Sequence, residues 1–259
     1  MDASYWDKRE IAELLINHPN IQVNKVGNFG QTALILAARR VLGAIVELLL
    51  DHPKVDVNVQ NTNGWSALMF AASENNATLV KVLAYHPKIW INQAEINGET
   101  ALHIACWHSP KTDGLAARYL LNHPNIEVNW ANNVGQTPIF KAVHEGNVAA
   151  LRLLLEENKI MVNYLDDARR TPLIYALQVV VDGWLAHEAI ALIDDGRTNL
   201  CHNSRGQEGA SAACVARRRD VGAVFWLLID KGVRCCDAGN LWEKITCPTT
   251  AGLKCYYWL

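Results

Sequence analysis

Gly98-Glu-Thr-Ala-Leu-His-Ile-Ala105 is one of four closely similar stretches in this chain of 259 residues. The other three begin at Gly30, Gly64 and Gly135, and a fifth copy has Arg169 in place of the glycine. These five positions are separated by 34, 34, 37 and 34 residues. Self-similarity with a period of this length predicts a stack of repeated supersecondary units.

Each unit has the residues of a turn followed by two short helices. The glycine suits a tight turn, and the Thr or Ser two positions later suits the cap of a first helix. Pro138 and Pro172 stand in the first helical turn, where the missing N–H costs little. A Leu-rich block that ends in Asn follows each copy, as at 48–58, and the same block at 14–24 precedes the first copy.

The apolar residues of a unit form one stripe on each expected helix. In the first full unit, Leu34, Ala37 and Ala38 share a face of one helix, and Ile45 and Val46 lie on a face of the next. Two short helices cannot bury these faces by themselves. We therefore expect neighbouring units to stack into a one-dimensional solenoid held by contacts between adjacent repeats.

The pattern resembles the ankyrin repeat, in which Gly and Thr-Pro-Leu-His precede a small-residue helix, a Leu-rich helix and a closing Val-Asn. Gly98-Glu-Thr-Ala-Leu-His103 is the nearest match in this chain. The resemblance implies an all-α ankyrin-repeat solenoid, with helix-turn-helix units joined by β-hairpin-like fingers.

The expected domain boundaries follow the repeats. The ranges are an N-terminal half-repeat cap at 1–24, repeats at 25–58, 59–92, 93–129, 130–163 and 164–199, a degenerate repeat at 200–237 and a capping tail at 238–259. Extra residues at 107–114 and 179–184 lengthen two connections between helices. Because Arg169 replaces the turn glycine, we expect the finger of that unit to differ in shape.

The resemblance also implies where a partner would bind, because ankyrin proteins use their finger tips and the concave face of the first helices. The finger positions are Phe29, Gln31, Asn63, Trp65, Glu99, Val134 and Gln136. The concave positions are Arg39, Arg40, Glu74, Trp107, His108, His144 and Glu145. Exposed aromatic side chains rimmed by charges are typical of a binding surface, with Trp65 and Trp107 as anchors. The alternative is that these aromatic side chains pack against neighbouring fingers.

The predicted function is a non-catalytic protein–protein interaction module, acting as a scaffold or adaptor. The alternative is an enzyme or small-molecule binder with a pocket around Trp107, His108, His144 and Glu145. A deep enclosed cavity there would favour the alternative, and an open shallow groove would favour the interaction module. The chain could also be the recognition part of a larger assembly.

We expect no cofactor and no metal. None of the seven Cys residues lies three positions from another, so the Cys-x-x-Cys spacing of zinc sites is missing. His103, Cys106 and His108 fall on one expected helix, but His103 and Cys106 occupy structural positions of the repeat. The Cys residues of the last sixty positions either close a metal-bound cap or are small buried apolar residues of a diverged repeat.

Two other recurring features have structural explanations. The closing Asn at 24, 58, 92, 129, 163 and 199 is expected to bond the backbone that shapes each loop. His-Pro pairs begin at 18, 52, 86 and 123, where proline ends a helix and histidine is expected to cap its last carbonyls.

Charge and composition exclude further classes. The 24 Lys and Arg against 26 Asp and Glu give a net charge of -2, so nucleic acid is an unlikely partner. The N-terminus lacks the basic and apolar segments of a signal peptide, and no apolar run approaches the length of a membrane span. We expect a cytoplasmic monomer with reduced thiols, with a nuclear location as the alternative.

Overall fold

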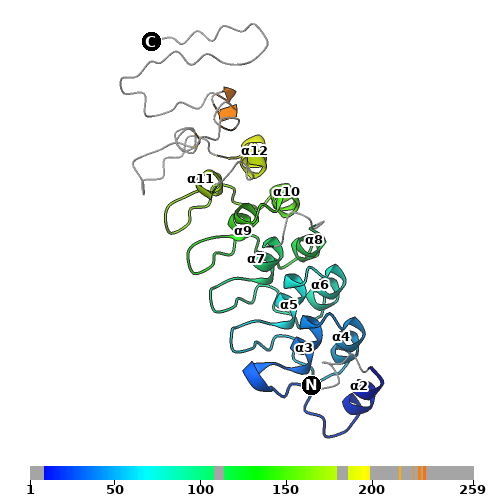
Figure 1. Cartoon of the computed structure of the whole chain (residues 1–259). Helices are drawn as coiled ribbons and strands as arrows, with labels where there is room; N and C mark the ends of the chain where they lie inside the picture. The colour runs from blue at the N-terminus through cyan, green and yellow to red at the C-terminus, as the bar shows by residue number, and fades with distance from the viewer. Residues whose placement is uncertain are drawn as a thin grey trace, which may run out of the picture.

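The computed structural model describes residues 9–107, 114–179 and 186–198, together with the single residues Ala216, Val224, Leu227, Leu228, Asp230 and Lys231. The described part is a stack of helix pairs with finger loops projecting from one side (Figure 1). Among these residues no strand is assigned, and the fingers contain one isolated antiparallel bridge between Ala94 and Thr100. The all-α solenoid expected from the repeats is confirmed.

The helices form two rows (Figure 1). The inner row, beside the fingers, contains the first helix of each unit: α3 (Ala33–Arg39), α5 (Ala67–Ser73), α7 (Ala101–Cys106), α9 (Pro138–His144) and α11 (Pro172–Val179). The outer row contains α2 (Arg9–Ile16), α4 (Gly43–Leu50), α6 (Ala77–Ala84), α8 (Leu115–Leu121), α10 (Val148–Glu156) and α12 (Ala186–Asp194). A short 3-10 turn, η1 (Asn28–Gly30), lies in the first finger.

The inner helices begin where the Thr and Ser residues predict. Thr32 Oγ1 accepts a hydrogen bond from Ile35 N at 3.2 Å, and Thr171 Oγ1 accepts one from Ile174 N at 3.3 Å. Such caps satisfy backbone N–H groups that have no partner inside the helix. Pro172 is the first residue of its helix, in the position where proline costs no hydrogen bond.

The core is spread along the stack and has no single centre. Small residues such as Ala37 and Ala71 are fully buried, and so are Ile45 and Val46 on the outer row. Each inner helix packs against the next one along the row, and the outer helices do the same. Burial between successive units is therefore what stabilises each short helix.

The turn glycines adopt the left-handed conformation, with φ of +78° at Gly64 and +80° at Gly98. The expectation that the Arg169 finger differs in shape is wrong. Arg169 adopts the same conformation, with φ +57°, and its N–H donates to Asp166 O at 2.8 Å. Gly64 N donates to Asn61 O at 2.9 Å in the corresponding turn. The hydrogen bonds of the turn thus hold arginine in a region that favours glycine.

The closing Asn residues tie successive units together. Asn58 Nδ2 donates to Lys88 O at 2.7 Å, and Asn58 Oδ1 accepts from Trp90 N at 2.8 Å. The same pair of bonds is made by Asn24, Asn92 and Asn129, and Asn163 donates to Arg197 O at 2.8 Å. The structural role expected of these five amides is confirmed, and Asn199 lies outside the described residues. They bond the loop of the following unit, about one repeat further along the chain.

The histidines of the His-Pro pairs do not cap helix carbonyls, so that expectation is wrong. Each Nδ1 instead accepts a hydrogen bond from the backbone N–H two residues later, as His86 does from Lys88 N at 3.3 Å. His18, His52 and His123 make the same contact. Proline lies between the two residues and turns the chain, which brings the next N–H towards the ring. Burial and the charge of Lys88 lower the pKa of His86, so its ring favours the neutral, accepting form.

Several expectations fall on residues outside the described ranges. These are most of both lengthened connections, nearly all of the 200–237 repeat, the 238–259 tail and its Cys residues. The proposed repeat boundaries stay predictions. No described helix combines the length and apolar character needed to cross a membrane.

Candidate functional site

The second to fifth fingers are each shaped by a polar side chain three residues before the turn position. Asn61 Oδ1 accepts hydrogen bonds from Asn63 N at 3.0 Å and Trp65 N at 2.8 Å. The later fingers use Glu95, Asn132 and Asp166 in the same way. The first finger has Gly27 at this position and makes the 3-10 turn instead. The side chains that follow each turn are therefore held in a fixed direction.

Backbone hydrogen bonds also join each finger to the next. Thr62 N donates to Phe29 O at 3.0 Å, and Asn133 N donates to Asn97 O at 2.9 Å. Two longer bonds, Ile96 N to Asn63 O at 3.4 Å and Asp167 N to Val134 O at 3.3 Å, continue the series. The finger tips thus form one connected row.

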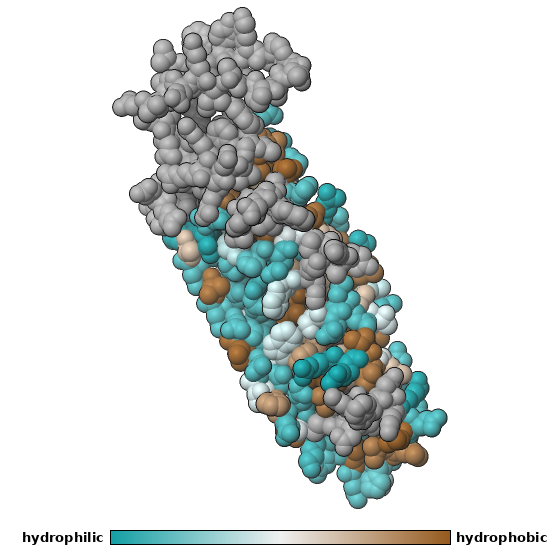
Figure 2. Space-filling model, viewed as in Figure 1, coloured by the Kyte–Doolittle hydropathy of each residue, from teal (hydrophilic) through white to brown (hydrophobic). Residues whose placement is uncertain are grey.

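We call the exposed side of the inner helices, beside the fingers, the inner face. It corresponds to the expected concave face. The predicted site residues divide by exposure. Those that are exposed are Phe29, Arg39, Arg40, Asn63, Glu74, Trp107, Val134 and His144, and those that are half-buried are Gln31, Trp65, Glu99, Gln136 and Glu145. His108 lies outside the described residues. Figure 2 shows apolar side chains separated by polar ones along one edge of the stack. Among the finger residues, Phe29 is 75% and Val134 55% exposed.

A depression of about 450 Å³ lies between the first two fingers and their helices. Three aromatic rings line it, Phe29, Trp65 and Phe70, and Trp65 packs against Phe70 with ring centroids 5.0 Å apart. The Arg39 guanidinium carbon lies 5.8 Å from the Phe70 ring centroid. Amide and hydroxyl side chains complete the lining: Gln31, Asn61, Thr62 and Asn63. Trp65 therefore packs against helix α5 of its own unit and also lines the depression.

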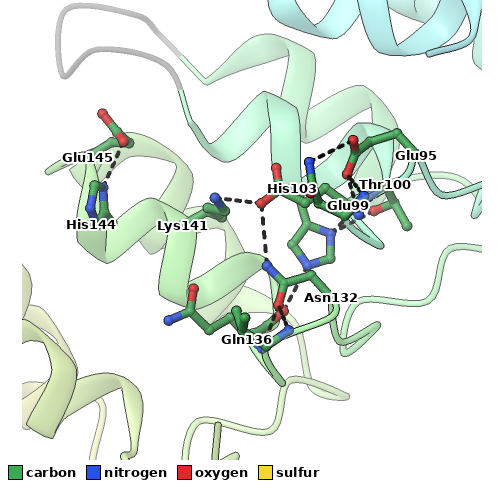
Figure 3. A network of polar contacts seen from close by, with 11 residues as sticks. Glu95, Glu99, Thr100, His103, Asn132, Gln136, Lys141, His144 and Glu145 are labelled. Carbon is green, nitrogen blue, oxygen red and sulfur yellow. Dashed lines mark hydrogen bonds and ion pairs between the residues drawn. The ribbon is translucent and has the colours of Figure 1, made fainter. Parts of the chain in front are cut away.

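A polar cluster occupies the middle of the inner face (Figure 3). Lys141 Nζ lies 2.5 Å from Glu99 Oε1 and 5.8 Å from the Trp107 ring centroid. Asn132 Nδ2 donates to the same Glu99 oxygen at 3.4 Å. The cluster joins two successive units and keeps the Trp107 ring, 49% exposed, beside a positive charge.

His103 lies beneath this cluster and is completely buried (Figure 3). Its Nδ1 accepts from Thr100 N at 3.2 Å, and its Nε2 lies 3.1 Å from Gln136 O. This pairing requires a neutral ring with the proton on Nε2. Burial, opposed by the Gln136 hydrogen bond, lowers the pKa of His103 from 6.5 to about 4. The residue therefore connects two units and has no access to a substrate.

The other groups weighed for catalysis lack the required surroundings. Burial raises the pKa of the Cys106 thiol to about 12, so it is not a nucleophile at neutral pH. His144 Nδ1 lies 2.8 Å from Glu145 Oε1, but the His144 side chain is 51% exposed and stacks on Tyr175. Neither residue lines the depression. Within the described ranges no group of His, Cys, Asp or Glu has the arrangement of a metal site.

Sequence reasoning missed the sixth position after each turn residue. In three units this position holds Phe70, Lys141 and Tyr175. Each of these side chains takes part in a contact between a cation and an aromatic ring on the finger side. Arg170 lies over Tyr175, with its guanidinium carbon 4.7 Å from the ring centroid, and pairs with Asp166 at 2.6 Å. The available signal was the change from aliphatic residues in other units to aromatic or charged ones at this position.

The comparisons with known proteins agree with this architecture. A family model of ankyrin repeats matches three times, over residues 1–93, 42–130 and 111–193. The chain belongs to the ankyrin-repeat family. Ankyrin repeats generally act as protein–protein interaction modules.

A solved structure also resembles this ankyrin-repeat chain. It is the crystal structure of the ankyrin repeat domain of Bcl-3, described as a unique member of the IkappaB protein family. The TM-score is 0.68 at 23% sequence identity, and the match covers 79% of this chain and 88% of that chain. At this identity the likeness shows the fold alone. A search of curated protein sequences found no match.

Proposed function

We propose that the chain binds a partner protein without catalysis, through its finger tips and inner face. The observation that carries this proposal is the row of finger tips joined by hydrogen bonds, with exposed apolar side chains beside aromatic and cationic groups. Because the fingers are already ordered, little conformational entropy is lost when a partner binds. Mixed charges on this surface favour a protein partner over nucleic acid.

Aromatic anchors carry a large part of the binding free energy at such surfaces. Trp65 lines the depression, and Trp107 lies beside Lys141 of the polar cluster. One partner that spans the inner face would therefore contact both. The proposed localisation is cytoplasmic, and the proposed state is a monomer. The binding proposal depends neither on the localisation nor on the oligomeric state.

The test is to replace Trp65 and Trp107 together by alanine and to identify captured proteins by affinity purification and mass spectrometry. We expect the double variant to lose its partners, since truncating a hot-spot residue costs about 2 kcal/mol or more, roughly 30-fold in affinity. Trp90→Ala is the matched control, because Trp90 is 67% exposed in the loop after α6, outside the depression and the polar cluster. Circular dichroism checks that each variant folds. Retention of the same partners by the folded double variant would refute the proposed surface.

A further inference from the structure

Three cationic side chains stand over aromatic rings on the finger side of the stack. The pairs are Arg39 over Phe70, Lys141 over Trp107 and Arg170 over Tyr175. Each pair belongs to the inner helices or the root of a finger. The same arrangement recurs along the stack, so the three pairs can be compared with one another.

Two of the three cations have a carboxylate partner within the chain. Lys141 pairs with Glu99 at 2.5 Å, and Arg170 pairs with Asp166 at 2.6 Å. Arg39 makes no ion pair with any described residue, and Glu74, which ends the neighbouring helix α5, does not reach it. The guanidinium of Arg39 therefore keeps its donors available on an exposed surface.

The surroundings of Arg39 explain what such a group would bind. It lines the depression of about 450 Å³ together with the rings of Phe29, Trp65 and Phe70, and no carboxylate is part of the lining. The site is thus positively charged and aromatic at once. The amides of Gln31 and Asn63 add donors and acceptors suited to a peptide backbone.

The finger that carries Phe29 is ordered before any ligand binds. Phe29 has φ +59°, which is unusual for a bulky residue, and its carbonyl accepts a hydrogen bond from Thr62 N. Its side chain is nevertheless 75% exposed. The Phe29 ring is thus held at the rim of the depression and is not packed into the core.

We propose that this depression takes a peptide segment of the partner in which an aspartate or glutamate lies beside an apolar side chain. The carboxylate would supply to Arg39 the partner that Glu99 and Asp166 supply to the other two cations. Charged hydrogen bonds of arginine to a carboxylate are often bidentate, which fixes the direction of the segment. The apolar side chain would pack among the three rings. This inference rests on the proposed function and specifies the chemistry of one part of the same surface.

The test uses a phage-displayed library of random peptides, selected on the full chain and sequenced. We expect enriched peptides to share an acidic residue next to an aromatic or aliphatic one. Arg39→Gln should weaken a synthetic copy of such a peptide about tenfold or more in fluorescence polarisation, since a hydrogen bond to a charged group is lost. Arg39→Glu should shift selection towards basic peptides. Arg152→Gln, an exposed arginine on outer helix α10, is the matched control and should change neither result.

The outcomes separate this inference from the proposed function. Enriched peptides without acidic residues that still depend on Trp65 would overturn the acidic specificity and leave the protein-binding surface intact. Peptides that bind Arg39→Gln and Trp65→Ala as tightly as they bind the unaltered chain would show a site elsewhere and overturn the inference. Failure to enrich any peptide above the level seen with Trp65→Ala would also overturn it. Partner capture by the double tryptophan variant is a separate measurement. It tests the proposed function, and its result does not depend on Arg39.

Discussion

Gly64 shows how closely successive fingers approach one another. Its φ is +78°, and a β-carbon there would lie 2.8 Å from the Glu95 Cα and 2.9 Å from the Ile96 N of the next finger. Both contacts are to backbone, so no side-chain rotation can relieve them. The residue that sets the turn also sets the spacing between units.

Gly64→Ala should therefore lower the free energy of unfolding by about 2 kcal/mol or more, from the left-handed conformation and the backbone contacts together. Gly43→Ala is the control within the same protein. A β-carbon at Gly43 meets only Leu79 Cδ2 at 3.8 Å, and Gly43 begins helix α4. This second change should stabilise by about 0.5–1 kcal/mol. Urea unfolding midpoints measure both, and equal midpoints for the two variants would contradict the account of finger spacing.

At the scale of one element, helix α7 shows how a first helix is joined to its neighbours. His103 accepts a hydrogen bond from the cap residue Thr100 and contacts the Gln136 carbonyl of the next unit. The ring is neutral and completely buried, so its protonation would break the capping contact and charge the interior. The stability of this helix is therefore linked to pH.

The sign follows from the folded pKa of about 4, which lies below the usual 6.5. Between these values the unfolded chain binds more protons, so stability is full above pH 6.5 and is lost as the pH falls towards 4. The expected loss from His103 is about 3 kcal/mol. Burial lowers the pKa of His86 and His123 as well, so they act in the same direction.

The contribution of His103 is isolated by urea unfolding of the wild type and His103→Gln from pH 7 to pH 4. The variant should be less stable at pH 7, and the difference should shrink as the pH falls. A difference that stays constant over this range would mean that His103 does not remain neutral in the folded chain.

At the scale of the whole molecule, stability and binding use different sides of the same repeat. Buried alanines and aliphatic residues hold the two helix rows together, and Asn58 and its counterparts tie each loop to the next unit. The aromatic and charged side chains on the finger side do not take part in this packing. Such a stack presents a long, ordered surface without a single core.

The sequence was sufficient to predict the repeat period, the first residues of the inner helices and the faces that are buried, because these recur along the stack. The cap hydrogen bond itself does not recur in every unit, since Thr137 Oγ1 accepts none. Five residues that the sequence assigns to partner binding lie together in the lining of the depression: Phe29, Gln31, Arg39, Asn63 and Trp65. The sequence could not predict Phe70 or Lys141, because their importance comes from contacts between different units. The Arg169 finger was mispredicted because turn hydrogen bonds can hold a residue in a conformation that its own preference disfavours.

The central claim is that a partner protein lies on the finger side of the stack. Its most direct test is site-specific photo-crosslinking in cells that express the chain, with a photoreactive amino acid at one exposed position at a time. Asn63 and Glu74 sample the finger side, and Glu47 and Arg152 sample outer helices α4 and α10. The account predicts the same crosslinked protein from Asn63 and Glu74 and none from Glu47 or Arg152. Crosslinks that form only from Glu47 and Arg152 would contradict it.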